Sequence, residues 1–177
     1  MNTQAKNGLQ LVAAQGQSAI DTYYDLARLS AQRTGETLAP IEYYREIWQR
    51  FSLSGRCALL FAYDGDRPAA AVFLLIDKRA ASYLAGVSDP GSLSKRPNNF
   101  MHWSAMLWAR ERGLSHYRFG PIFPEVPPDW PIARVSRFKS QFGARSVTVI
   151  QGSYFRRPER YLEPAIEQLR GLHRSEA

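Results

Sequence analysis

The chain has 177 residues, of which 45% are hydrophobic and 22% are charged. That length fits one domain of ordinary size, and the hydrophobic content is enough for a core, which excludes a disordered chain. The formal net charge of +7 favours anionic partners such as nucleic acid or phosphorylated substrates. The single cysteine, Cys57, excludes an internal disulfide and a cysteine-based metal site, and its apolar surroundings predict a buried thiol.

The sequence shows no sign of a membrane span or a secretion signal. No stretch approaches 18 apolar residues, so no membrane-spanning helix is expected. The first ten residues lack an apolar segment, which makes the cytoplasm the expected compartment. We expect residues 1–17 to form an N-terminal tail with a short strand at 9–13, and residues 18–177 to form one domain.

The first half of that domain predicts two helices followed by three strands. Apolar residues recur with helical spacing over 18–32 and again over 40–51. Nearly continuous apolar runs then predict strands joined by tight turns, over 56–63, 68–76 and 80–87.

The second half alternates helices and strands after a loop over 88–97. The predicted elements are a helix over 100–112, a strand over 116–119, a proline-rich loop over 120–131, a helix over 132–142, a strand over 146–151 and a helix over 158–173. An antiparallel meander followed by helix–strand crossovers predicts an α/β fold with a mixed sheet, antiparallel first and then parallel. The order and lengths of the elements resemble a single lobe of a GNAT-type acyltransferase.

The strong catalytic motifs are absent. The sequence has no G-x-G-x-x-G, no phosphate loop and no G-x-S-x-G, and its three histidines are too scattered to predict a metal site. GNAT enzymes that use acyl-CoA usually carry a Q/R-x-x-G-x-G/A loop, whose amides hold the pyrophosphate. The corresponding stretch, 87–99, has one glycine and two prolines, and proline has no amide proton to donate. The sequence therefore has the order of elements of a GNAT lobe but lacks the motif that binds the pyrophosphate of CoA.

Four short runs, over 83–88, 97–103, 109–113 and 117–120, resemble the second GNAT-like lobe of the Fem family. The most specific piece is RFKSQFG at 137–143, which is similar to the family's R/K-F-K-x-x-F-G stretch. Fem proteins are aminoacyl-tRNA-dependent peptidyltransferases of peptidoglycan bridge synthesis. The resemblance therefore implies transfer of an amino acid from aminoacyl-tRNA, as co-substrate and without a further cofactor, onto the amine of a peptide or nucleotide-linked acceptor.

The resemblance also implies roles for individual residues. Lys139 falls at the family's functionally important lysine, where an ammonium group would stabilise a tetrahedral oxyanion. Tyr83 resembles a cleft tyrosine that would position the amine or relay a proton. The candidates for substrate binding are Phe138, Arg137, Arg33 and Asn99. The alternative for each is structural: a solvated lysine, a packed strand tyrosine, a core phenylalanine or a surface polar residue.

Two tryptophans and a histidine lie in the helix predicted over 100–112. We expect Trp103 and Trp108 to pack in the core. We expect His102, at the start of this helix, to be a hydrogen-bonded structural histidine rather than a general base.

Most of the positive charge lies between residues 133 and 160, where seven basic residues stand against Glu159 and give a net +6. Concentrated positive charge fits the phosphate contacts of a tRNA, and the aromatic pair at 154–155 could stack on an unpaired base. A solvated basic face is the alternative. The predicted nucleic-acid contacts are Arg134, Arg145, Arg156, Arg157 and Arg160.

Three functions remain open on the sequence alone. Aminoacyl-tRNA-dependent transfer is the first, an acyl-CoA-dependent N-acyltransferase with a degenerate pyrophosphate loop is the second, and a non-catalytic GNAT-like binding module is the third. Fem proteins contain two such lobes, and the resemblance covers one of them. A second copy of the chain, in a homodimer, could therefore supply the other half of an acceptor site.

Overall fold

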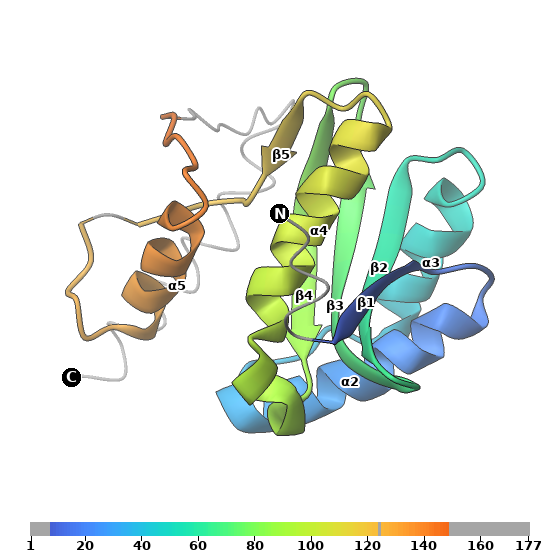
Figure 1. The fold of residues 1–177 in the computed structure, drawn as a ribbon, viewed down its shortest axis with the longest axis horizontal. Coiled ribbons are helices and arrows are strands. Elements are labelled where there is room, and N and C mark those ends of the chain that lie inside the picture. Colours follow the sequence, from blue (N-terminus) through green and yellow to red (C-terminus); the bar gives the residue numbers. More distant parts are fainter. Residues whose placement is uncertain (1–7, 124, 149–177) are drawn as a thin grey trace, which may run out of the picture. The chain divides into compact units, whose positions relative to one another are not determined.

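A five-stranded mixed sheet, in the order β1-β2-β3-β4-β5, forms the centre of the fold in the computed structural model, which describes residues 8–123 and 125–148 (Figure 1). The antiparallel strands are β1 (Leu9–Ala13), β2 (Cys57–Asp64), β3 (Arg67–Ile76) and β4 (Ala80–Ser88), and β5 (His116–Arg118) pairs parallel to β4. This pattern confirms the predicted fold class, a GNAT-like α/β lobe with a mixed sheet. All five strands lie within one residue of their predicted bounds.

Helices cover both faces of the sheet (Figure 1). On one face lie α2 (Ser18–Thr34) and α3 (Ile41–Phe51), and on the other lies α4 (Pro97–Glu111). The central strands β2 and β3 are therefore buried on both sides, which is why their sequences are continuous apolar runs rather than alternating ones. A 3₁₀ helix, η1 (Pro90–Lys95), joins β4 to α4.

Two apolar cores result, one on each face of the sheet. Under α2 and α3, the rings of Tyr23, Tyr44 and Trp48 pack around Phe73 of β3. Under α4, the core includes Phe100, Met101, Ala105 and Ala109 together with side chains of β2 and β3. Cys57 is buried at the start of β2, as predicted, and burial raises the pKa of its thiol to about 11.

The placement of Trp103 in the core was wrong, because this side chain is 44% exposed. Trp103 and Trp108 are five residues apart, which places them about 140° apart around a helix, so both cannot face the sheet. Trp108 is the one that packs against the core, and the Arg112 guanidinium stacks 4.0 Å from the centre of its ring.

The chain divides into two compact units, Met1–Ala144 and Arg145–Ala177, and every described helix and strand lies in the first. The last of these is α5 (Pro131–Ser140), which follows the proline-rich loop. Residues 146–148 form no strand, in contrast to the strand predicted there. The remainder of that strand and the predicted helix over 158–173 lie outside the described residues.

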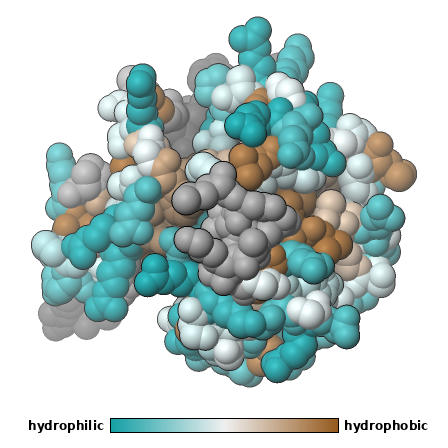
Figure 2. Space-filling view, in the orientation of Figure 1, coloured by the Kyte–Doolittle hydropathy of each residue, from teal (hydrophilic) through white to brown (hydrophobic). Residues whose placement is uncertain are grey.

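The surface seen in Figure 2 is mostly hydrophilic, with apolar side chains in small groups. Among the described residues, no helix combines the length and the apolar character that a membrane crossing requires.

Candidate functional site

The strands β4 and β5 part from each other soon after they meet. Their register joins Ala80–Ser82 to His116–Arg118, and β4 then continues to Ser88 while β5 has ended. In open α/β sheets, ligands bind outside the carboxyl ends of the strands, where neighbouring strands or their connections diverge. We therefore place the candidate site at this end of the β4–β5 pair.

A bulge in β4 sets the direction of Tyr83 at this point. Phe73 pairs with Ala85 and Leu74 pairs with Tyr83, so Leu84 is an extra residue in the ladder. Bulges of this kind re-aim side chains and are frequent beside active sites. The Tyr83 ring lies over Gly86 of the same strand, where an added Cβ would come within 2.8 Å of the Tyr83 hydroxyl oxygen.

His102 of α4 is the common neighbour of five aromatic rings, and together these six side chains are called the His102 cluster below. Their ring centres lie 5.1–6.0 Å from that of His102. The rings come from β4, from β5 and the residue after it, and from α5 with the turn that follows it: Tyr83, Tyr117, Phe119, Phe138 and Phe142. The fold thus brings segments far apart in the sequence to one place.

The imidazole of His102 is buried and hydrogen-bonded, as the sequence analysis predicted. Its Nδ1 lies 3.0 Å from the Tyr117 hydroxyl oxygen. Burial, and to a smaller extent the Lys139 ammonium, lower the pKa of His102 to about 4. The ring is therefore neutral near pH 7, and a group of such low basicity in an aromatic enclosure serves to hold the site together.

Lys139 of α5 lies beside this cluster with its ammonium held in place. Its Nζ donates a hydrogen bond to the carbonyl oxygen of Pro121 at 2.8 Å. The side chain is half-buried, and burial lowers the pKa of Lys139. An ammonium has three N–H donors, and the bond to Pro121 uses one of them. A partly desolvated, fixed cation of this kind interacts more strongly with a developing negative charge than a solvated one does.

Tyr83 is the second predicted catalytic residue, and it contacts the same histidine as Phe138. Burial, followed by the Glu36 carboxylate, raises the pKa of Tyr83 to about 12. The phenol is therefore protonated near pH 7 and is a hydrogen-bond donor there. Glu36 follows the end of α2 and was missed by the sequence analysis, because nothing in the local sequence shows that this connection comes within electrostatic reach of β4.

The other predicted residues lie at the surface. Arg134 and Arg137 are exposed on α5, Arg33 is exposed in the last turn of α2, and Asn99 is exposed in the first turn of α4. Within the described part of the chain, no side-chain hydrogen bond or ion pair joins these four residues to the His102 cluster. Arg145 is exposed and belongs to the second unit. Arg156, Arg157 and Arg160, and the aromatic pair at 154–155, lie outside the described residues.

The connection between β4 and α4 directs its polar groups toward Asp89. This carboxylate accepts hydrogen bonds from the Gly91 amide at 3.2 Å and from the Ser92 hydroxyl at 2.7 Å. A phosphate placed at the same amide would have to displace the carboxylate and would be repelled by it. Asp89 therefore performs internally the capping role that a bound anion performs in a phosphate-binding loop.

The start of α4 offers few free donors. Pro90 and Pro97 have no amide proton, and the amides of Asn99 and Phe100 both donate to the carbonyl oxygen of Arg96. Arg96 itself adopts a left-handed conformation with φ of 51°. The geometry thus agrees with the sequence-based expectation that this connection does not resemble a pyrophosphate loop.

Comparison with known proteins gives the family and the fold. A family model described as an acetyltransferase (GNAT) domain matches residues 2–130. The crystal structure of FemX is similar with a TM-score of 0.72 and 15% sequence identity, and the match covers 80% of this chain and 51% of that one. The chain thus spans about half the length of FemX. Comparison with curated protein sequences gave no significant match.

Two other solved structures are matched over almost their whole length. The aminoglycoside acetyltransferase meta-AAC0020, from an uncultured soil metagenomic sample, has a TM-score of 0.59 and 9% identity, with 84% of this chain and 97% of that chain covered. Glucosamine-6-phosphate N-acetyltransferase from Arabidopsis thaliana has a TM-score of 0.56 and 13% identity, with 83% and 98% covered. At these identities the likeness shows the fold alone. Because the family model matches well over half of its residues, the chain belongs to the acetyltransferase (GNAT) domain family.

Proposed function

We propose that the chain is a GNAT-fold aminoacyltransferase that moves an amino acid from aminoacyl-tRNA onto the amine of a peptide or nucleotide-linked acceptor. The observation that carries this proposal is the β4–α4 connection, where the Asp89 carboxylate accepts hydrogen bonds from the Gly91 amide and the Ser92 hydroxyl, in the segment whose amides would have to bind an acyl-CoA pyrophosphate. The similarity of residues 137–143 to the Fem stretch and the structural likeness to FemX support the same donor class.

Lys139 has the position and the charge to stabilise the transition state of this reaction. Attack of an amine on the aminoacyl ester places a negative charge on the carbonyl oxygen. The Lys139 ammonium is already oriented by the Pro121 carbonyl, so it loses little side-chain freedom when the oxyanion forms. Phe138, next to it on α5, would form a wall of the site through its contact with His102.

Tyr83 can complete the proton balance. The amine lone pair forms the new C–N bond, and the ester C–O bond breaks with its electron pair on the ribose oxygen of the tRNA. The amine must lose one proton, and the ribose oxygen must gain one. The Tyr83 hydroxyl, protonated at neutral pH because its pKa is about 12, gives its proton to the leaving oxygen and takes the proton of the amine, so that the phenol is regenerated.

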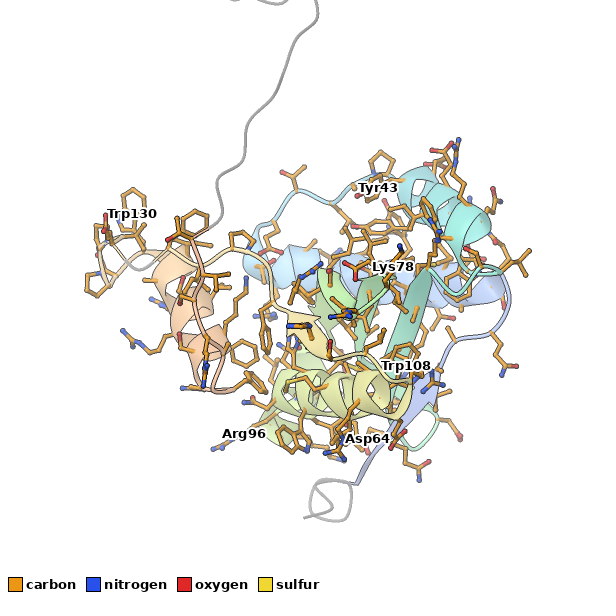
Figure 3. All side chains as sticks on the ribbon, turned by 90° about the horizontal axis from the view of Figure 1, so that it is seen from above. Tyr43, Asp64, Lys78, Arg96, Trp108 and Trp130 are labelled. Atoms are coloured by element: carbon orange, nitrogen blue, oxygen red, sulfur yellow. The ribbon has the colours of Figure 1, made fainter. Side chains whose placement is uncertain are left out.

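The test is transfer of a radiolabelled amino acid from aminoacyl-tRNA to a panel of amine-bearing peptides and nucleotide-linked peptides. The proposal predicts label in the acceptor that disappears when the tRNA is digested beforehand with RNase. Lys139→Ala should lower the transfer rate by about 10²-fold. The matched control is Lys78→Ala, an exposed lysine in the β3–β4 turn (Figure 3), which should transfer at the wild-type rate. Absence of transfer and of salt-dependent tRNA binding would contradict the proposal.

The second candidate is acyl-CoA-dependent N-acylation. It is favoured by the two acetyltransferases that the chain matches over 97% and 98% of their length. Thermal unfolding with CoA and acyl-CoA separates the candidates, because a ligand that binds only the folded state raises Tm with its concentration. A rise in Tm together with acetyl transfer supports this candidate and contradicts the first. If the chain uses neither donor, and wild type and Lys139→Ala give the same result in both assays, the third alternative holds, a non-catalytic GNAT-like binding module.

A further inference from the structure

One face of α5 carries exposed polar and aromatic side chains that the site does not use. Residues 130, 134, 137 and 141 recur at the spacing of one helix face, and they are Trp130, Arg134, Arg137 and Gln141. All four are exposed, and Trp130 is 54% exposed. Figure 3 shows Trp130 pointing outward at the start of α5. This set is called the outer face of α5 below.

The opposite side of α5 ties this face to the candidate site. Phe138 contacts His102, and the Ser136 hydroxyl accepts a hydrogen bond from the Phe123 amide at 3.1 Å. Lys139 is joined to the Pro121 carbonyl. Trp130 and Lys139 are nine residues apart, which corresponds to about 14 Å along a helix axis. A few unpaired nucleotides bound along the outer face would cover this length, and the RNA would then turn around the C-terminal end of α5 to reach Lys139 on the opposite side of the helix.

The Trp130 ring is presented by a restricted turn. Its amide donates to the carbonyl oxygen of Pro127 at 3.1 Å, and the backbone on both sides is limited by prolines, at 127, 128 and 131. A large ring held outward by a stiff backbone loses little conformational freedom when it stacks on a flat partner. Packing among the described residues does not account for a tryptophan in this position, because more than half of its side chain is exposed.

The charges on α5 select an anionic partner. Arg134, Arg137 and Lys139 are its only charged residues, and all three are basic. The carboxylates of Glu125 and Asp129 precede the helix, so favourable phosphate contacts are confined to α5 itself. A basic track with an aromatic ring at one end is the arrangement by which proteins bind single-stranded nucleic acid, with phosphates on the cations and a base on the ring.

We infer that the outer face of α5 binds the unpaired 3′ end of an RNA, with a base stacked on Trp130 and phosphates on Arg134 and Arg137. The inference rests on the proposed function in one respect: the RNA would be the aminoacyl-tRNA donor, whose charged end would reach Lys139. It adds the docking path and an anchoring tryptophan that the sequence analysis did not identify.

The test measures binding of a single-stranded RNA oligonucleotide, labelled at its 5′ end, by fluorescence anisotropy at several salt concentrations. Trp130→Ala should weaken binding about tenfold or more, and Trp130→Phe should retain most of it, because one stacked base contributes about 1–3 kcal/mol. Trp103→Ala is the matched control, since Trp103 is a similarly exposed tryptophan on α4, and it should bind as wild type does. Arg134→Ala and Arg137→Ala should each reduce the slope of log K against log salt by about 0.7.

Two results would overturn the inference. The first is equal binding of the RNA by wild type and Trp130→Ala, when circular dichroism shows that both are folded. The second is binding of polyglutamate that depends on Trp130 and is as tight as binding of the RNA, which would make an acidic protein the partner. The donor KM in the transfer assay separates this inference from the proposed function. If wild type transfers and Trp130→Ala has the same KM for aminoacyl-tRNA, the docking path is wrong and the function stands. If the RNA binds through Trp130 and no transfer occurs, the docking path stands and the function is wrong.

Discussion

Acid should destabilise the fold through His102 at a pH where most carboxylates are still ionised. Burial and the Lys139 ammonium lower the pKa of His102 from 6.5 to about 4, so folding favours the neutral ring. The unfolded chain binds the proton more readily than the folded one does. The stability that this histidine contributes is therefore complete above pH 6.5 and is lost as the pH falls toward 4.

The pKa difference sets the size of the effect. A shift from 6.5 to about 4 corresponds to about 3 kcal/mol when the titration is complete, at 1.36 kcal/mol per unit. Between about pH 8 and about pH 5 the loss is about 2 kcal/mol, because folded His102 is still largely neutral at the lower value. That is a large share of the stability of an ordinary domain.

The assay is urea unfolding at both pH values, followed by circular dichroism. The variants are His102→Gln, which keeps a hydrogen-bonding side chain opposite Tyr117, and His102→Phe, which keeps a ring in the cluster. On acidification, the free energy of unfolding of both variants should fall by about 2 kcal/mol less than that of wild type, whatever their stability at the higher pH. His116→Gln, at an exposed histidine, is the control and should follow wild type. An equal loss in wild type and both His102 variants would refute the reasoning.

Three further outcomes are expected. Tyr83→Phe should lower the transfer rate by about 10²-fold with little change in substrate KM, because the ring stays and only the relayed proton is lost; an unchanged rate would remove Tyr83 from the chemistry. Gly86→Ala should lower the free energy of unfolding by about 1–3 kcal/mol, since its Cβ would meet the Tyr83 ring, and this loss should shrink in a Tyr83→Ala background. Lys139→Arg should restore part of the transfer rate that Lys139→Ala loses, because arginine keeps the positive charge. If the lysine were purely structural, Lys139→Arg and Lys139→Ala would have the same kcat when their Tm values are equal.

The strands could be read from the sequence because each depends on local information. The turn at Asp64–Arg67 has a strong local signal, and the apolar runs on either side identify strands buried on both faces. The start of α4 was harder to predict from the sequence. The two asparagines at 98–99 predicted a helix from about 100, whereas the helix begins at Pro97, a residue well suited to the first helical position, and η1 before it was not predicted.

The candidate site could be predicted from the sequence only in part, because it depends on contacts between distant segments. The resemblance singled out Lys139, Tyr83 and Phe138, and the structure places Tyr83 and Phe138 against His102 and shows the charge of Lys139 acting on its pKa. Nothing in the local sequence reveals that Glu36 acts on Tyr83, whereas the capping of Gly91 and Ser92 by Asp89 has a local signal, an aspartate followed by proline, that the sequence analysis did not use. The effect of Glu36 follows from how α2 and β4 lie relative to each other, which is a property of the fold as a whole, whereas the Asp89 contacts are local to residues 89–92.

The central claim is the identity of the donor, and one side-by-side measurement tests it most directly. Wild type and Lys139→Ala are each given the same amine acceptor with either aminoacyl-tRNA or acetyl-CoA, and product is measured in a single turnover. The account predicts product from aminoacyl-tRNA that depends on Lys139 and on intact RNA, and none from acetyl-CoA. Product from acetyl-CoA and none from aminoacyl-tRNA would contradict it, whether or not that product depends on Lys139.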